Sequence, residues 1–439
     1  MDFTIATGSC ALTGSKSAMF TNILDVNPLM FIHMGDFHYE DLNTLEIDKR
    51  LEANDRVMGS PSQRVLYMNT IFSYMWDDHD WLGDNQDSED EYAAAVAKQS
   101  YTLGFPHDAL GSSSSDEATS AKYQAFTIVT VRFIMKDLRS ESIRSTEVYS
   151  GKVYSQEQKE WFFNELSQVA DYDFVVWVNT HPWTDPAEVG SDSWGGFVSD
   201  RDELSAHIAA TIGAGPQNLL VLSGDNHTVA FDDGSSTDYS DQDVFPGGFP
   251  LLHSGPMTNY GSGLFDFFNP QANYFTEGCM AYNSEVNYQF STVEFSFPSD
   301  ENQEGCMQIR SYSKDASSII FEKKLCGEVM RNGTPDQSTC TLERLTVPTQ
   351  SIFIGAFVLI TLNGIWTLWK LGRHGCTVAL SYFGLGIIYY FLTIMAAIAG
   401  AFCFGTLGVN MFAVSIFVLL QVVGVFLWTM HFTQRQCKS

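Results

Sequence analysis

The acidic residues of this 439-residue chain stop abruptly before its last fifth. The chain contains 52 acidic residues and has a net charge of -28, yet residues 351–439 contain no Asp or Glu. Three apolar runs in that part are each long enough for a membrane-spanning helix: 351–369, 377–404 and 409–430. We therefore predict an acidic, water-exposed domain followed by three transmembrane helices within residues 351–432.

The basic residues of the C-terminal part predict its orientation. Lys370 and Arg373 lie between the first two apolar runs, and Arg435 and Lys438 follow the third. With three spans, both groups fall on one side of the membrane, which the positive-inside rule makes cytoplasmic. Residues 433–439 would then be a short cytoplasmic tail, and the acidic domain would face the cell exterior or an endomembrane lumen. The first ten residues lack the basic and apolar segments of a signal peptide, so we expect a leader ahead of them.

The acidic charge also limits the class of partner. A strongly negative domain repels nucleic acid, so we expect no nucleic-acid-binding module. Asn332 begins a glycosylation sequon, Asn-Gly-Thr, in a predicted linker at 331–350. In an oxidising compartment, four late cysteines could form up to two disulfides, whose pairing the sequence leaves open. These cysteines are Cys279, Cys306, Cys326 and Cys340.

Apolar runs rich in β-branched and aromatic residues alternate with helical patterns in the acidic domain. The predicted strands are 2–6, 29–34, 125–136, 173–180 and 218–223. One helix is predicted from a Ser155 cap, and another from a cap at Ser199 or Asp200 to Gly213. Residues 286–326 alternate as a terminal meander. The pattern predicts an α/β fold with a sheet between helices and functional residues on the loops after strands.

Chemically active side chains follow several of these strands. They are Cys10; Asp36, His38 and Tyr39; Asp77, Asp78, His79 and Asp80; Asn179 and His181; and Asp225, Asn226 and His227. Taken singly, each segment has a structural explanation, such as a turn or a core cysteine. Taken together, they indicate a cation, because adjacent carboxylates are costly to bring near others without one. A folded site that collects Asp36, Asp78 and Asp225 would be held together by metal.

The order of these motifs resembles the PhoD-like (alkaline phosphatase D) family of metallophosphoesterases. The sequence runs through Cys, Gly-Asp-x-x-Tyr, Asp-Asp-His-Asp, a strand-end His and Gly-Asp-x-His. Four further stretches are similar to family segments: KDLRSESIR, YSQEQKEWFFNEL, WGGFVSDRDEL and HSGPMTN. The resemblance covers roughly residues 1–320, and we place the domain at 1–330. It implies a four-layer α/β/β/α sandwich, a dinuclear metal centre, and hydrolysis of phosphate monoesters or diesters.

The resemblance also implies roles for individual residues. Cys10 and Tyr39 would bind the first metal, and Asp36 would bridge both metals. His79 and Asp78 would match the catalytic motif, with His79 protonating the leaving group. The remaining metal ligands would be Asp78, His181, Asp225 and His227. Asn179 is a rival to His181, because it lies in the same turn.

The donor types favour particular metals. A thiolate and a phenolate favour iron(III) at the first site. Carboxylate and amide oxygens favour a hard cation at the second site, such as calcium, magnesium or manganese. The family resemblance also points to iron with calcium, and zinc is a further alternative.

Several functional alternatives stay open at this level. His38, Asn226 and Arg139 are candidates for holding phosphate, although each also suits a structural role. The leading hypothesis is a membrane-anchored extracytoplasmic phosphatase. The alternatives are a phospholipase-D-like phosphodiesterase acting at the membrane surface and a non-catalytic cell-surface binding protein. The sequence predicts neither the physiological phosphate ester nor the oligomeric state.

Overall fold

The computed structural model describes residues that all belong to one compact unit, Met1–Ser262 with Tyr274–Leu342. These residues are 1–87, 91–107, 120–144, 147, 150–185, 187–212, 218–234, 237–240, 248–259, 280–282, 288–298, 305–313, 316 and 319–327. The predicted linker, transmembrane helices and tail, and Asn332, lie outside them. Within the described ranges, no helix has the length and hydrophobicity needed to cross a membrane.

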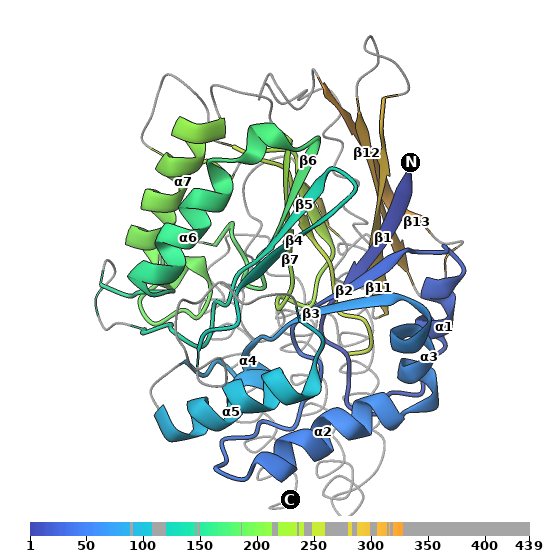
Figure 1. Cartoon of the computed structure of the whole chain (residues 1–439), viewed down its shortest axis with the longest axis vertical. Helices are drawn as coiled ribbons and strands as arrows, with labels where there is room; N and C mark the ends of the chain where they lie inside the picture. Colours follow the sequence, from blue (N-terminus) through green and yellow to red (C-terminus); the bar gives the residue numbers. More distant parts are fainter. Residues whose placement is uncertain are drawn as a thin grey trace, which may run out of the picture. The chain divides into compact units, whose positions relative to one another are not determined.

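Two mixed β-sheets lie at the centre of this unit (Figure 1). The strand order is β13-β12-β11-β1-β2-β3 in one sheet and β10-β8-β9-β7-β6-β5-β4 in the other. In the first, β1, β2 and β3 are parallel, and in the second, β5, β6, β7 and β9 are parallel. The strands are β1 (Phe3–Gly8), β2 (Met30–Met34), β3 (Ile71–Met75), β4 (Gln124–Ile128), β5 (Val131–Met135), β6 (Phe174–Val178), β7 (Leu219–Ser223), β8 (Ala230–Asp232), β9 (Leu251–His253), β10 (Met280–Tyr282), β11 (Gln289–Ser296), β12 (Cys306–Ser313) and β13 (Ile319–Cys326).

Helices pack against both sheets, so the predicted α/β class is confirmed. The helices are α1 (Met19–Leu24), α2 (Ile47–Gly59), α3 (Pro61–Asn69), α4 (Asp78–Trp81), α5 (Glu91–Gly104), α6 (Gln156–Leu166) and α7 (Val198–Ile212), with 3-10 turns η1 (Val169–Asp171) and η2 (Trp194–Gly196). Buried residues of α1, α2, α3 and α5 join the apolar cluster of the six-stranded sheet. Those of α6 and α7 join a second cluster on the seven-stranded sheet.

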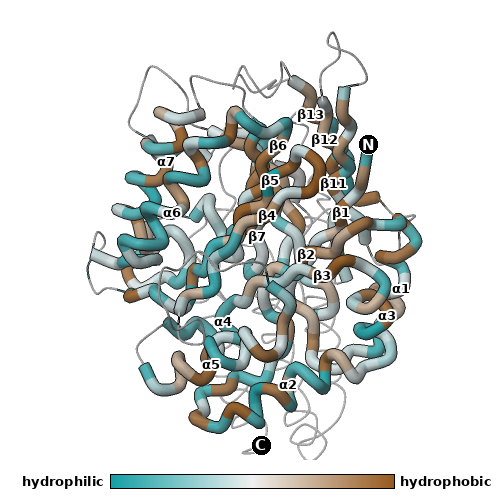
Figure 2. The backbone as a smooth tube through the Cα atoms, in the orientation of Figure 1, coloured by the Kyte–Doolittle hydropathy of each residue, from teal (hydrophilic) through white to brown (hydrophobic). Residues whose placement is uncertain are grey.

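Strand β6 shows how the seven-stranded sheet is buried on both faces. Phe174 and Val176 belong to the cluster shared with the other sheet, and the Phe174 ring lies 5.4 Å from that of Phe295 in β11. Val175 and Trp177 point the other way, into the cluster under α6 and α7. A strand with two buried faces has a continuous apolar sequence. Figure 2 accordingly shows hydrophobic colour along β5 and β6.

The prediction of a single strand at 125–136 is wrong. The segment forms a hairpin in which β4 and β5 pair antiparallel around Val129 and Thr130. Tight hairpin turns favour Gly, Asn or Asp at positions with positive φ. Here Val129 takes such a conformation, with φ 57°, so the turn carries no residue that would mark it in the sequence.

One of the two predicted helix caps is confirmed, and the other is wrong. Ser155 caps α6 as expected, because its Oγ accepts a hydrogen bond from Gln158 N at 3.2 Å. The cap predicted for the next helix is wrong, because α7 begins at Val198, before both proposed cap residues. The Asp200 carboxylate instead accepts a hydrogen bond from Val153 N at 2.9 Å, which ties α7 to the chain that enters α6.

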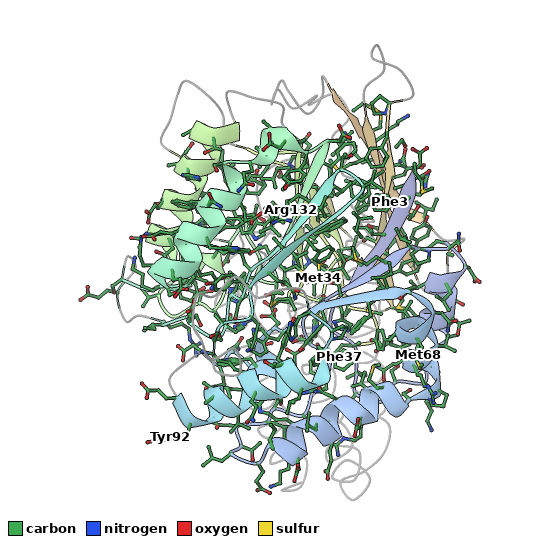
Figure 3. All side chains as sticks on the ribbon, in the orientation of Figure 1. Phe3, Met34, Phe37, Met68, Tyr92 and Arg132 are labelled. Carbon is green, nitrogen blue, oxygen red and sulfur yellow. A yellow bond between two sulfur atoms is a disulfide. The ribbon has the colours of Figure 1, made fainter. Side chains whose placement is uncertain are left out.

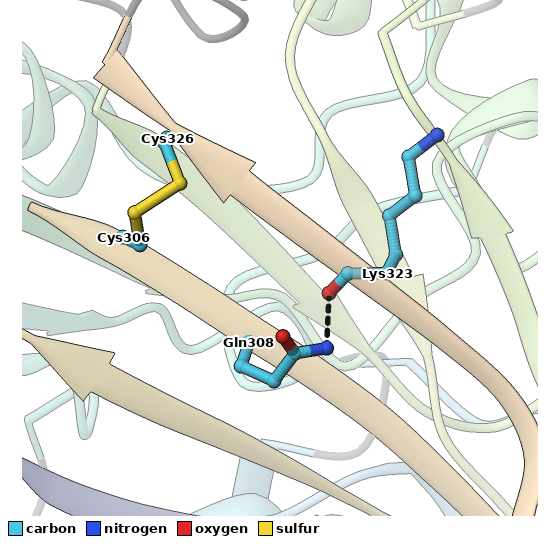
Figure 4. Close-up of a disulfide and its surroundings, with 4 residues drawn as sticks. All are labelled: Cys306, Gln308, Lys323 and Cys326. Atoms are coloured by element: carbon cyan, nitrogen blue, oxygen red, sulfur yellow. Dashed lines mark hydrogen bonds between the residues drawn. A yellow bond between two sulfur atoms is a disulfide. The ribbon is translucent and has the colours of Figure 1, made fainter.

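One disulfide lies within the described residues and joins β12 to β13 (Figure 4). Cys306 and Cys326 occupy opposed positions of this antiparallel pair. Beside them, Gln308 Nε2 donates a hydrogen bond to the carbonyl oxygen of Lys323 at 3.2 Å. The pairing therefore uses two of the four late cysteines. Cys279 and Cys340 lie outside the described residues.

Candidate metal centre

The loops that follow five strands are hydrogen-bonded to one another at the carboxyl ends of the parallel strands. After β1 and β2, Cys10 N donates to Gly35 O at 3.2 Å. After β6 and β7, Gly224 N donates to Thr180 O at 3.0 Å. The segment after β9 bonds to both pairs, because Thr258 N donates to Cys10 O at 3.3 Å and Ser254 N donates to Ser223 O at 2.9 Å. Residues far apart in sequence therefore meet at one site.

Four candidate ligands have left-handed backbone conformations. The φ angles are 60° at Cys10, 56° at Asp36, 68° at Asp225 and 47° at His227. Such conformations are uncommon outside glycine, cost about 1–3 kcal/mol each, and cluster at functional sites. The packing of the loops holds these residues in place. A Cβ on Gly35 would lie only 2.3 Å from Asp77 Cβ, so this approach requires glycine.

Three overlapping groups of side chains could each hold a cation. The groups are Cys10, Asp36 and His227; Asp36, Asp78 and His79; and Asp77, Asp78 and Asp225. In each group, one donor atom per residue lies within 4.8 Å of the others. Asp36 is shared by the first two groups, and Asp78 by the last two. The shared carboxylates place the groups next to one another, as a multinuclear centre requires.

Tyr39, another predicted ligand, lies beside the first group. Tyr39 Oη donates to Asp36 Oδ2 at 2.7 Å and lies 3.0 Å from His227 Nε2. Cys10 is fully buried, and burial together with the Asp36 charge raises the pKa of its thiol well above the ordinary value. Burial and Asp36 raise the pKa of the Tyr39 phenol in the same way. Both groups would need a cation to ionise at neutral pH.

The carboxylates at the centre repel one another in a buried environment. Burial and the Asp78 charge raise the pKa of Asp36 well above its ordinary value. Burial and the Asp77 charge do the same for Asp225. Burial opposes ionisation of Asp78 too, but Arg139 and other groups outweigh it, so its pKa is lowered. One buried guanidinium does not compensate four carboxylates, so without further positive charge some of these carboxylates would be protonated.

Several donor atoms at the centre are buried without a hydrogen-bond partner among the described residues. These atoms are Asp36 Oδ1, Asp77 Oδ2, and His181 Nδ1 and Nε2. Buried polar atoms are nearly always bonded. Carboxylate oxygens and imidazole nitrogens are also the usual ligands of hard and borderline cations. The residues present therefore fit a metal centre.

The geometry favours His181 over Asn179 as a donor. Asn179 Nδ2 donates to His181 O at 2.7 Å and to Ser223 Oγ at 3.0 Å, and Asn179 Oδ1 accepts from Trp194 Nε1 at 2.7 Å. Both amide donors and the amide oxygen of Asn179 are therefore engaged inside the protein. His181 Nε2 faces the acidic cluster, 3.5 Å from Asp77 Oδ1. Burial lowers the pKa of His181 well below its ordinary value, which keeps the ring neutral and able to coordinate.

His79 lies at the solvent side of the cluster. Its side chain is 18% exposed, its Nδ1 lies 2.6 Å from Asp41 Oδ1, and its Nε2 lies 3.7 Å from Asp84 Oδ1. The ring centroid is 4.2 Å from that of Tyr39, which belongs to the first group. This arrangement suits proton exchange with a molecule that enters from solvent.

The three candidates for holding phosphate have different surroundings. Arg139 is 2% exposed and forms ion pairs with Asp77 and Asp192, so its charge supports the cluster. His38 is also 2% exposed, and burial lowers its pKa to about 3. Asn226 is half-buried in the loop after β7. The burial of Arg139 and His38 therefore favours a structural role for both residues.

Three acidic residues have contacts at the centre that were not predicted from the sequence. Asp77 joins the third donor group, and Asp41 contacts His79. Asp80 organises the turn, because it accepts from Asp77 N at 2.6 Å and from Phe37 N at 2.8 Å. Phe37, labelled in Figure 3, is fully buried, and this anchors the loop that carries Asp36. The Asp-Asp-His-Asp motif signalled Asp77 and Asp80, whereas no local pattern marked Asp41.

The comparisons with known proteins bear on the fold. No family model matches the chain, and no curated protein matches it. The solved structure of PhoD matches with a TM-score of 0.54 and 14% identity, over 74% of this chain and 71% of that one. The chain has the fold of PhoD. A structure of TT1561 from Thermus thermophilus is also similar, with a TM-score of 0.29 and 9% identity over 58% of this chain and 90% of that one.

Proposed function

We propose that the chain is a metal-dependent phosphoric ester hydrolase that cleaves phosphate monoesters, diesters or both. The observation that carries this proposal is the sharing of Asp36 and Asp78 among three largely buried donor groups at the strand ends of a PhoD fold. Shared carboxylates allow cations to lie close together, as in two-metal phosphoesterases.

The donor sets suggest which residues would hold which cation. Cys10, Tyr39 and His227 would hold iron(III), and Asp36 would be shared with its neighbour. Asp78, Asp225 and His181 would hold calcium, with magnesium, manganese or zinc as alternatives. When bound, the cations would supply Lewis acidity that polarises a phosphoryl oxygen and acidifies water.

His79 would protonate the leaving group, and Asp41 would assist it. With Nδ1 bonded to Asp41 Oδ1 at 2.6 Å, the proton to be delivered would sit on Nε2. The Asp41 carboxylate would stabilise the imidazolium and fix the ring orientation. Burial lowers the pKa of His79, but Asp78 and Asp41 outweigh it and raise the pKa above the ordinary value. His79 would therefore donate a proton to the departing alkoxide.

The test uses the purified full-length chain. We expect bound iron and a second metal by elemental analysis, together with hydrolysis of a chromogenic phosphate monoester or diester that stops after chelation. A higher rate on the diester would favour the phosphodiesterase alternative. A folded chain that stayed metal-free and inactive after addition of iron and calcium would contradict the proposal and favour a non-catalytic binding protein.

We further propose that three C-terminal helices anchor the enzyme, with the catalytic domain outside the cytosol. The Cys306–Cys326 disulfide supports this placement, because disulfides persist in oxidising compartments. We expect glycosidase treatment of the chain from eukaryotic cells to increase its gel mobility, and Asn332→Gln to remove that shift. An unglycosylated chain with Cys306 and Cys326 reduced in intact cells would contradict the proposed topology.

A further inference from the structure

The stretch Trp194-Gly195-Gly196-Phe197 has no role in the chemistry described above. Trp194 opens η2 and is fully buried. Its indole Nε1 donates a hydrogen bond to Asn179 Oδ1 at 2.7 Å. This bond joins the segment before α7 to the end of β6, directly beside the candidate ligand His181.

Asn179 is also hydrogen-bonded to two other segments of the metal centre. Its Nδ2 donates to His181 O at 2.7 Å in the loop after β6 and to Ser223 Oγ at 3.0 Å at the end of β7. The β7 strand leads directly to Asp225. One amide therefore connects the backbone of one candidate ligand to the strand that carries another.

Trp194 is itself firmly held. Its ring lies 4.9 Å from that of Trp183 and 6.2 Å from that of Trp177, centroid to centroid. Its backbone N–H donates to Pro182 O at 3.3 Å, and the Lys136 ammonium lies 5.6 Å from its ring. A side chain packed on several sides can impose its position on Asn179, rather than adapt to it.

Hydrogen bonds within the described residues hold the backbone of His181 rather than its ring. Neither ring nitrogen has a hydrogen-bond partner among the described residues, so no such bond to the ring fixes its direction. The carbonyl of the same residue is held by Asn179. We propose that Trp194 and Asn179 act as one positioning unit that presents His181 to the acidic cluster. The inference rests on the metal centre proposed above.

The proposal predicts a selective loss of metal affinity. Residues that orient metal ligands typically change affinity by about 10- to 100-fold when replaced. We expect Trp194→Phe, which keeps a ring but loses the indole N–H, to weaken Mn²⁺ binding at one site by about 10- to 100-fold. The measurement is electron paramagnetic resonance of free Mn²⁺ during titration of the chelator-treated full-length chain, with the thermal midpoint recorded alongside.

Asn179→Leu completes the test. It keeps nearly the same size without adding charge but loses both amide donors and the acceptor for Trp194, so we expect a loss of Mn²⁺ affinity of the same size. Because the two residues act as a unit, the double variant should bind no more than about threefold more weakly than either single variant. Fully additive losses would contradict the positioning unit. If Trp194→Phe fails to fold, the Asn179→Leu result alone decides.

Trp183→Phe is the matched control. It loses an equivalent indole hydrogen bond, from Trp183 Nε1 to Thr237 O at 2.8 Å, in the same aromatic cluster. We expect it to lower the thermal midpoint while Mn²⁺ affinity stays within about threefold of wild type. Equal affinity losses in the control and the test variants would overturn the proposal. Wild-type chain that takes up no Mn²⁺ would contradict both this inference and the metal centre, whereas binding without hydrolysis would contradict only the proposed function.

Discussion

Replacing Asp36 with Asn is expected to abolish phosphate ester hydrolysis and to remove both metals. Asp36 belongs to two donor groups, so loss of its charge weakens both at once. Loss of the shared ligand should reduce turnover to background, since it removes the metal contribution as well as one side chain. Elemental analysis and a chromogenic phosphate ester assay on the same preparation measure the two effects together.

The same replacement should leave the stability of the metal-free protein unchanged or raise it. Because the pKa of Asp36 is raised in the folded state, the unfolded chain releases this proton first as pH rises. The Asp36 carboxyl therefore lowers stability above its ordinary pKa, and Asn removes that penalty. We expect metal-free Asp36→Asn to melt at the same temperature as metal-free wild type or higher at pH 7.

Asp55→Asn is the matched control for Asp36→Asn. Asp55 is exposed on α2, so this variant removes the same charge outside the metal centre. We expect its metal content and turnover to equal those of wild type. An Asp36→Asn variant with full metal content and wild-type turnover would contradict the shared-ligand assignment.

His79→Ala is expected to have the second largest effect. Loss of a general acid typically lowers turnover by about 10²- to 10⁴-fold. The loss should be greatest for alkyl phosphates, whose poor leaving groups need a proton, and smallest for nitrophenyl esters. We expect metal content to stay near wild type, since Asp78 and Asp36 keep their other donors.

Asp41→Asn separates positioning from proton donation in the same experiment. It keeps the imidazole and changes only the group bonded to Nδ1, so we expect a loss of about tenfold with the same dependence on leaving group. Equal turnover of His79→Ala and wild type on alkyl phosphates would remove His79 from the mechanism.

The sequence predicted the structure best where ligand-type side chains directly follow an apolar strand. The strands around 29–34, 173–180 and 218–223 were predicted because buried parallel strands are continuously apolar. The residues just after them meet because the carboxyl ends of parallel strands share one edge of a sheet. Cys10, Asp36 and His227 were each predicted as metal ligands, and the structure places one donor atom of each within 4.8 Å of the others.

Other features depend on contacts that no local pattern records. The hairpin at Val129 was missed because its turn contains a residue that rarely adopts positive φ. The choice between Asn179 and His181 requires Trp194, which lies in a separate segment. The contact of Asp41 with His79 spans 38 positions between two loops, and its existence follows only from how the loops fold over the sheet.

The position of β1 has a consequence for how the protein is made. β1 lies between β2 and β11, and Phe3 pairs with Phe295. The strand that carries Cys10 at its end cannot complete its hydrogen bonding until almost 300 residues have been synthesised. At about 5–20 residues per second, this wait is roughly 15–60 s. In the proposed metal centre, metal capture at Cys10 would therefore be a late step of biosynthesis, and the nascent chain would have to keep this thiol from other reactions until then.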